Sequence, residues 1–190
     1  MGRMWSDTLA GKVLIATPSI SDPRFARSVI YLCAHTDEHA MGFVLNKPKG
    51  GLKLAELLTQ PGIEFTIEVP ARPVLDGGPC DQERGFVLHS DDYQSRDATL
   101  EVGEGLRLTA TRDVLEAIAH DHGPRRAVLA LGHAGWAAGQ LEQELLDNAW
   151  LVGEPDFGLL FGQDNASNWT RALARIGVDP ARLSAVAGHA

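Results

Sequence analysis

The segment AVLALGHAGWAAGQLEQELLDNAW, from Ala127 to Trp150, is the stretch around which the rest of the chain is arranged. Its first five residues, Ala127–Leu131, form an apolar run too short for a helix and typical of a buried strand. Gly132–Gly139 contains three glycines and predicts a loop. Gln140–Leu146 predicts a helix, because its leucines lie four residues apart on one face. A strand, a glycine loop and a helix in this order place backbone groups at a sheet edge, where open α/β folds bind ligands.

The predicted glycine loop and the helix after it supply candidate ligand-binding residues, namely His133, Gly135, Trp136 and Gln140. The glycine spacing matches neither a dinucleotide fingerprint nor a P-loop. Glu142 and Glu144 near the helix start would repel an incoming anion, although they could hold a divalent cation that bridges to phosphate. The alternative interpretation is that the glycines only allow close packing on the sheet, with Trp136 as a plug.

Outside this segment, strand and helix patterns mix without regular βαβ alternation. Strands are expected over 12–17, 28–34, 41–45, 65–69, 85–89, 99–102, 106–108 and 150–152. Helices are expected over 52–58, 111–119 and 165–176, and 46–51 is expected to be a loop. The mixture predicts an α+β or mixed α/β fold in one domain over 1–190, with room for a small lobe.

The charge balance disfavours direct nucleic-acid binding. The chain carries 17 basic and 25 acidic residues, a net charge of −8, whereas a nucleic-acid binder needs a cationic face. No signal peptide pattern and no apolar run of about 20 residues is present, so we expect a cytoplasmic protein without a membrane segment. The two cysteines form no Cys-x-x-Cys pair, and we expect no metal centre.

Two residues are candidates for catalysis on the basis of their neighbours. Glu144 could act as a general base if it were buried near the predicted loop. Cys33 lies two positions before His35 in a predicted strand, so the thiol and the imidazole would share one face as an activated nucleophile. A solvated helix face and a small buried thiol are the alternatives.

His89 is a third catalytic candidate, because it closes an apolar strand and could line a site near Gly77 and Gly78. A core histidine with satisfied hydrogen bonds is the alternative. Asn46 could offer side-chain hydrogen bonds at a strand end, or could be an ordinary turn residue. Asn46, Gly77 and Gly78 therefore complete the predicted ligand-binding set, and no cofactor is identified.

Five segments of the chain resemble the YqgE/AlgH family of bacterial proteins. They are GKVLIATPSISDPRFARSVIYLCAH (11–35), AMGFVLNKP (40–48), DGGPCDQERGFVLH (76–89), LGHAGWAAGQLEQELLDNAWL (131–151) and the terminal LSAVAGHA. His133 stands where the family usually has Tyr, and Cys80 stands where Val is usual. A role that rests on a phenol at position 133 is therefore not carried over.

The resemblance implies a bifurcated mixed sheet, partly barrel-like and flanked by helices. The family carries the label of transcriptional regulator, yet this sequence contains no helix-turn-helix pattern. We therefore expect a regulator that acts indirectly, through a protein or a small effector. The alternative is a small-ligand binder, for a phosphate or nucleotide, or a hydrolase, that uses Gly132–Gly139.

Overall fold

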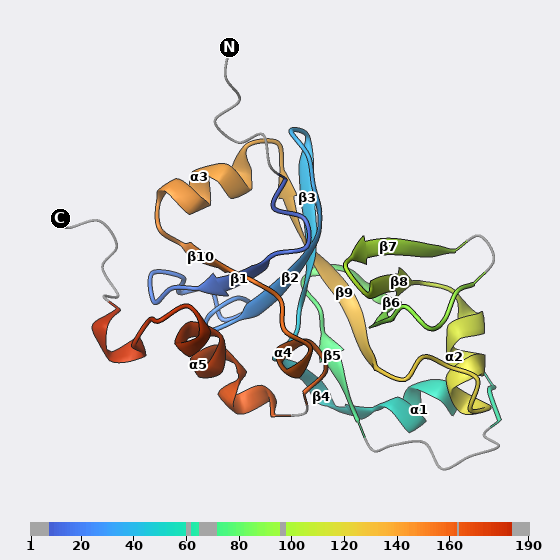
Figure 1. Cartoon of the computed structure of the whole chain (residues 1–190). Coiled ribbons are helices and arrows are strands. Elements are labelled where there is room, and N and C mark those ends of the chain that lie inside the picture. The colour runs from blue at the N-terminus through green and yellow to red at the C-terminus, as the bar shows by residue number, and fades with distance from the viewer. Residues whose placement is uncertain (1–7, 60–61, 65–71, 96–97, 163, 184–190) are drawn as a thin grey trace.

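The computed structural model describes residues 8–59, 62–64, 72–95, 98–162 and 164–183. In this part of the chain, ten strands form a curled sheet that makes a half-barrel, and five α-helices flank it (Figure 1). The predicted α+β class with a bifurcated, partly barrel-like sheet is confirmed. The sheet is mixed, because β5 runs parallel to β9 and the other paired strands are antiparallel.

The strands are β1 (Val13–Ala16), β2 (Val29–His35), β3 (His39–Val44), β4 (Pro48–Lys53), β5 (Pro73–Asp76), β6 (Cys80–Ser90), β7 (Thr99–Gly103), β8 (Leu106–Thr109), β9 (Ala127–Ala137) and β10 (Trp150–Gly153). The helices are α1 (Leu54–Thr59), α2 (Arg112–Ala119), α3 (Gln140–Leu146), α4 (Phe157–Phe161) and α5 (Asn165–Arg175). The main path of the sheet runs β10-β1-β2-β3-β9-β6-β8-β7. The strand expected over 65–69 lies outside the described residues.

The sheet divides at β9, which changes partners along its length. Its first half, Ala127–Leu131, pairs with β6 and, in parallel, with β5, whereas its last four residues pair with β3. Gly132 lies between the halves with φ of 77°, a left-handed conformation that glycine adopts without the usual steric penalty. A Cβ atom there would lie 2.5 Å from the carbonyl oxygen of Gly78, so only glycine permits this approach.

Two loop predictions are wrong in the light of these strands. The loop expected over Gly132–Gly139 is strand β9 as far as Ala137, because the glycine at 132 kinks the strand without ending it. The loop expected over 46–51 becomes β4 from Pro48, and helix α1 starts at Leu54, two residues later than expected. Helix α3 begins and ends where the leucine spacing predicted it.

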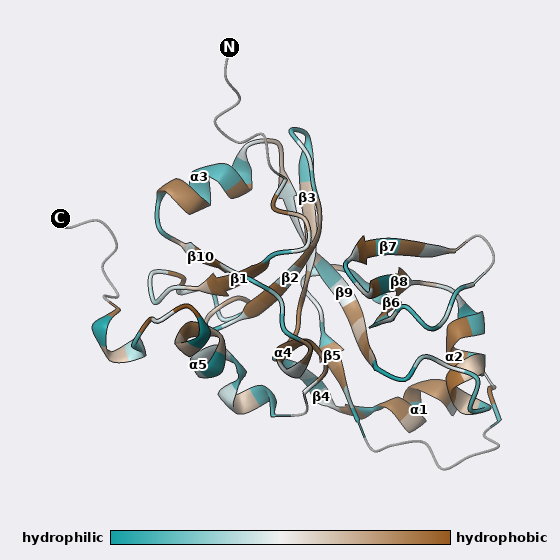
Figure 2. Ribbon diagram, in the orientation of Figure 1, coloured by the Kyte–Doolittle hydropathy of each residue, from teal (hydrophilic) through white to brown (hydrophobic). Residues whose placement is uncertain are grey.

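The central strands are buried on both faces, which explains their continuous apolar sequence. Successive residues of a strand point to opposite faces, so Val13 and Ile15 join one apolar cluster while Leu14 and Ala16 join another. The first cluster lies under α4 and α5, and the second under α3. A third lies between the sheet and helices α1 and α2, whose apolar residues are visible in Figure 2.

Candidate functional site

The largest gathering of predicted site residues is an open hollow between β9, α3 and the segment after β1. We call it the tryptophan hollow. Its volume is about 310 Å³, and its lining is Ile20, Asp22, Arg24, Phe25, Gly135, Trp136, Gln140, Glu144, Ala149 and Trp150. Three aromatic rings meet edge to face there, with centroids 6.1 Å apart for Trp136–Trp150 and 6.3 Å apart for Phe25–Trp150.

Glu144 holds the wall of the tryptophan hollow together. Its Oε2 atom accepts the indole N–H groups of Trp136 and Trp150, each at 2.8 Å. Its Oε1 atom accepts from the amide of Gln140 at 3.2 Å, and the Gln140 carbonyl in turn accepts from the Ala137 N–H at 3.0 Å. The carboxylate is thus engaged on both oxygens, so its observed contacts are those of a positioning group.

A charged pair lies at the edge of the tryptophan hollow. The guanidinium of Arg24 donates to the Asp22 carboxylate through Nε and through Nη2, the latter at 2.7 Å. These hydrogen bonds from Arg24 hold the pKa of Asp22 below its usual value. Arg24 also lies over the ring of Phe25, 5.7 Å from its centroid. The hollow therefore combines aromatic walls with an exposed ion pair.

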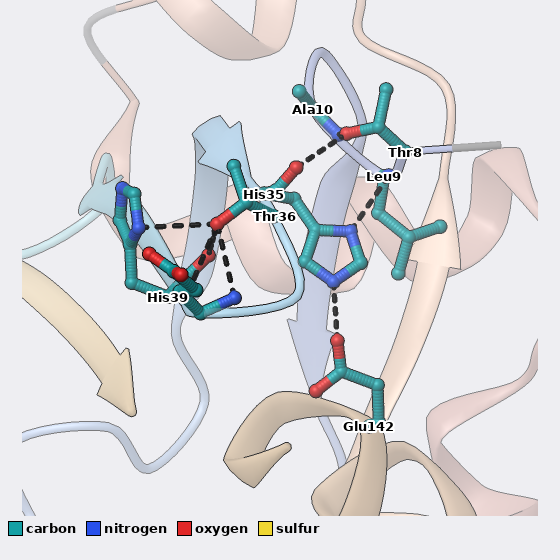
Figure 3. Close-up of polar contacts among 8 residues, drawn as sticks. Thr8, Leu9, Ala10, His35, Thr36, His39 and Glu142 are labelled. Carbon is teal, nitrogen blue, oxygen red and sulfur yellow. Dashed lines mark hydrogen bonds and ion pairs between the residues drawn. The ribbon is translucent and has the colours of Figure 1, made fainter. Parts of the chain in front are cut away.

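A second polar cluster fixes the other face of α3 (Figure 3). The N–H of Leu9 donates to Nδ1 of His35 at 3.0 Å, so Nδ1 must be unprotonated. Nε2 of the same ring therefore carries the proton and donates to Oε1 of Glu142 at 2.5 Å. This hydrogen bond lowers the pKa of Glu142.

Cys33 and His35 do not form the predicted nucleophile. The pairing of β2 with β3 is irregular between Leu32 and Ala34, which disturbs the alternation of side chains at Cys33. Both nitrogens of His35 are used by Leu9 and Glu142. Burial raises the pKa of the Cys33 thiol well above its usual value, which disfavours the reactive thiolate.

His89 is a core histidine with every ring nitrogen bonded. Nδ1 donates to the Ser90 carbonyl at 2.7 Å, so Nε2 accepts, and the Thr109 hydroxyl donates to it at 2.8 Å. Thr99 donates to Thr109 and accepts from the Ser95 N–H, each at 2.8 Å. Burial lowers the pKa of His89, so the ring stays neutral in this network.

Asn46, Gly77 and Gly78 lie away from the tryptophan hollow. The Asn46 amide joins two backbone groups, accepting from the Val29 N–H at 2.9 Å and donating to the Arg27 carbonyl at 2.8 Å. Gly77 and Gly78 are buried against β9, and a Cβ atom on either would lie 2.3 Å from a β9 backbone atom. Their observed role is close packing of the turn before β6.

The structure thus brings together Gly135, Trp136, Gln140 and Glu144, with His133 on the strand beside them. It places Cys33, Asn46, Gly77, Gly78 and His89 elsewhere. The sequence analysis missed Arg24, Phe25 and Trp150 as site residues. Their position depends on the pairing of β1 with β10, which sets Ala16 opposite Trp150.

Two kinds of feature are absent from the described residues. No group of three or more His, Cys, Asp or Glu side chains is arranged there to hold a metal ion. None of the helices described in the structure has the length and apolar character needed to cross a membrane.

The half-barrel with its bifurcated sheet and flanking helices defines an α+β protein with an aromatic hollow beside the dividing strand. Residues 13–181 match the family profile described as AlgH-like, and the chain belongs to this family. It is 54% identical to a UPF0301 protein of Caulobacter vibrioides, over 96% of this chain and 94% of that one. It is 53% identical to a UPF0301 protein of Nitrobacter hamburgensis, over 96% and 88% respectively.

Solved structures share the fold. The solution structure of the AlgH protein from Pseudomonas aeruginosa matches with a TM-score of 0.76 and 43% identity, over the whole of each chain. A crystal structure of a Corynebacterium diphtheriae protein matches with a TM-score of 0.71 at 24% identity, over 92% of this chain and 90% of that one, which is a likeness of fold alone. The names of these relatives assign no biochemical activity.

Proposed function

We propose that this protein binds a small effector in the tryptophan hollow, and that the bound effector controls its contact with a protein partner. Any effect on transcription is then indirect, through that partner, as the family label of regulator suggests. The observation that carries the proposal is the sharing of one Glu144 oxygen by the indoles of Trp136 and Trp150. This arrangement holds the aromatic walls in place before a ligand arrives.

The dimensions and chemistry of the tryptophan hollow suit a small molecule. Ligand sites commonly have volumes of roughly 300–1,000 Å³, with aromatic walls and a few polar groups that set orientation. The hollow has about 310 Å³, three aromatic rings, and the Arg24–Asp22 pair at its edge. A planar ring compound with an anionic or hydrogen-bonding substituent fits this combination, because the ring meets the aromatic walls and the substituent meets Arg24.

Tryptophan emission tests effector binding directly, because two of the four tryptophans line the hollow. The native protein is titrated with aromatic carboxylates, nucleosides and nucleotides while emission and melting temperature are followed. A ligand at about 100 times its dissociation constant should stabilise the fold by roughly 2.7 kcal/mol. We expect a compound of this class to quench emission and raise the melting temperature.

A pair of arginine variants separates binding in the hollow from binding elsewhere. Arg24→Ala removes the cation at the hollow, whereas Arg112→Ala removes an arginine of similar exposure that is paired with Glu116 on α2. The proposal expects weaker binding in the first variant only. A screen without any stabilising compound, or equal losses in both variants, would count against it. Retention on DNA that weakens steeply with salt would contradict the indirect route.

A further inference from the structure

A thiol and an imidazole lie on neighbouring strands where β6 begins beside β9. Cys80 and His133 are directly opposite each other in the register of these strands. Opposite residues of an antiparallel pair extend from the same face of the sheet. A Cβ atom on Gly135 would lie 3.7 Å from Sγ of Cys80 and 3.9 Å from Cε1 of His133, so both side chains border the space above this exposed glycine.

The carboxylate of Asp81 lies beside the imidazole ring of His133. Its Oδ2 atom lies 3.1 Å from Nε2 of His133. In a regular strand, Asp81 would point away from the face that carries Cys80. Here its φ is 47°, and the pairing of β6 is irregular between Cys80 and Gly85, so the alternation is broken. A non-glycine residue held in this left-handed conformation is a feature that clusters at functional sites.

Two oxygen atoms lie beside the nitrogens of the His133 ring and can accept hydrogen bonds from it. Nδ1 lies 3.4 Å from the Ala134 carbonyl oxygen, and Nε2 lies beside the Asp81 carboxylate. Both oxygens only accept hydrogen bonds, so the ring satisfies both contacts when each nitrogen carries a proton. A positively charged imidazole beside a cysteine favours the thiolate, which is the reactive form of the sulfur.

Cys33 provides the internal comparison for Cys80. Burial raises the pKa of the Cys33 thiol, which disfavours its thiolate. Cys80 instead stands opposite His133 in the strand register.

The cluster is open to solvent on the side of Asp81, and Cys80 itself is half-buried. Asp81 lines a wide, open hollow of about 700 Å³ together with Pro79, Gln82, Glu83 and Arg84. Thiol–disulfide exchange requires a thiolate and access for the incoming sulfur. Acyl transfer requires hydrogen-bond donors for an oxyanion in addition. Exchange is therefore the reaction for which these residues suffice.

We propose that Cys80 is a site of thiol–disulfide exchange with low-molecular-weight disulfides, with His133 as proton carrier and Asp81 as its positioning residue. The proton of the Cys80 thiol passes to His133, and the sulfur attacks one sulfur of the disulfide. A bond forms between these two sulfurs, and the original disulfide bond breaks. The departing thiolate takes the proton from His133. The products are a mixed disulfide on Cys80 and one free thiol, and the reaction is independent of effector binding.

The test uses the full native chain, oxidised glutathione at neutral pH, and mass spectrometry of each cysteine peptide over time. Cys33 serves as the internal control. We expect Cys80 to acquire glutathione roughly tenfold faster than Cys33, or more. His133→Gln should slow Cys80 about tenfold, and Asp81→Asn about threefold, because each weakens the stabilisation of the thiolate. Glu83→Gln removes a charge from the same open hollow and should change the rate by less than about twofold.

Equal rates at Cys80 and Cys33 would overturn the proposal. A Cys80 rate that is unchanged in both His133→Gln and Asp81→Asn would do so as well. If Asp81→Asn and Glu83→Gln have the same effect, the carboxylate acts only through general charge, and its assigned role is wrong. The Asp81 side chain is 65% exposed, so we expect Asp81→Asn to leave the fold intact. Asp81→Asn therefore tests the site even if His133→Gln alters the fold.

Discussion

Nε2 of His35 donates to Oε1 of Glu142 at 2.5 Å and joins β2 to α3 across 107 positions of the chain. The proton must lie on this nitrogen, because the backbone N–H of Leu9 occupies the other one. One neutral imidazole thus links the segment before β1, strand β2 and helix α3. Since α3 also carries Gln140 and Glu144, the contact helps to hold the helix that forms one wall of the tryptophan hollow.

The His35–Glu142 contact predicts part of the acid sensitivity of the fold. The hydrogen bond from His35 keeps the Glu142 pKa in the folded state below 4.5. The carboxylate therefore contributes stability above pH 4.5, and this contribution is lost as the pH falls through the lower folded-state pKa. Glu142→Gln retains an acceptor for His35 but removes the ionisation. Urea unfolding from roughly pH 3 to pH 7 should show a shallower acid decline in the variant.

The native protein and Glu142→Gln should differ only slightly in their free energy of unfolding, because Glu142 is partly exposed and solvent screens its charge. The difference should stay below about 1 kcal/mol at neutral pH. The difference between the two proteins should narrow as the pH falls below the Glu142 pKa, where both side chains are uncharged. If the two stability profiles run parallel over the whole range, ionised Glu142 contributes nothing to folding and the interpretation is wrong.

Glu144→Ala should destabilise the protein through two buried indoles. Trp136 and Trp150 are each only 5% exposed, and both donate to the Oε2 atom that this change removes. Each unsatisfied buried donor costs about 1–3 kcal/mol, so the two indoles together should lower the free energy of unfolding by roughly 2–6 kcal/mol. Urea unfolding followed by tryptophan emission measures it. Gln143→Ala, at an exposed position of the same helix, is the control and should cost much less.

Thr109→Val tests whether the His89 network is structural. The variant keeps the shape of the side chain but removes the hydroxyl that donates to Nε2 of His89, a ring with no solvent exposure. The unsatisfied Nε2 acceptor of His89 should lower the free energy of unfolding by about 1–3 kcal/mol. Thr59→Val, at an exposed position that ends α1, should cost less. Equal losses in chemical denaturation would mean that His89 does not depend on the Thr109 hydroxyl.

The sequence could predict elements whose signal is local. The leucine spacing predicted α3 correctly, and the apolar run at Ala127–Leu131 predicted the first half of β9. The prediction of a loop beyond Gly132 is wrong, because a glycine with a left-handed φ is compatible with both a loop and a kinked strand. What decides between them is the contact of Gly132 with the carbonyl oxygen of Gly78. That contact lies far away in the sequence and has no local signature.

The sequence likewise predicts one part of the candidate site and not the other. Trp136, Gln140 and Glu144 come from one short segment, so their spacing in the sequence predicts a common location. Arg24 and Phe25 follow β1, and they reach the tryptophan hollow only because β1 pairs with β10. Strand pairing over more than a hundred positions leaves no periodic pattern in the sequence, so these residues could be expected to form a turn but not a wall.

Two glycines with nearly equal φ separate steric crowding from backbone strain. Gly132 has φ of 77° and Gly139 has φ of 75°, so a change to Ala imposes a similar conformational cost on both, of about 1–2 kcal/mol. At Gly139 no atom of the described residues lies within 4 Å of a new Cβ atom. At Gly132 a new Cβ atom would lie 2.5 Å from the Gly78 oxygen and 2.9 Å from the Cys80 oxygen. These neighbours are backbone atoms that cannot rotate away.

Gly132→Ala is therefore expected to lower the free energy of unfolding by about 1–3 kcal/mol more than Gly139→Ala, because overpacking adds this amount to the strain. Thermal unfolding of the two variants measures the difference. Because Gly132 lies where β9 leaves β6 for β3, amide hydrogen exchange in Gly132→Ala should also increase at Ala134 and Gly135 in the second half of β9. If the two variants have equal stability, the close approach of Gly78 is not what requires glycine at the division of the sheet.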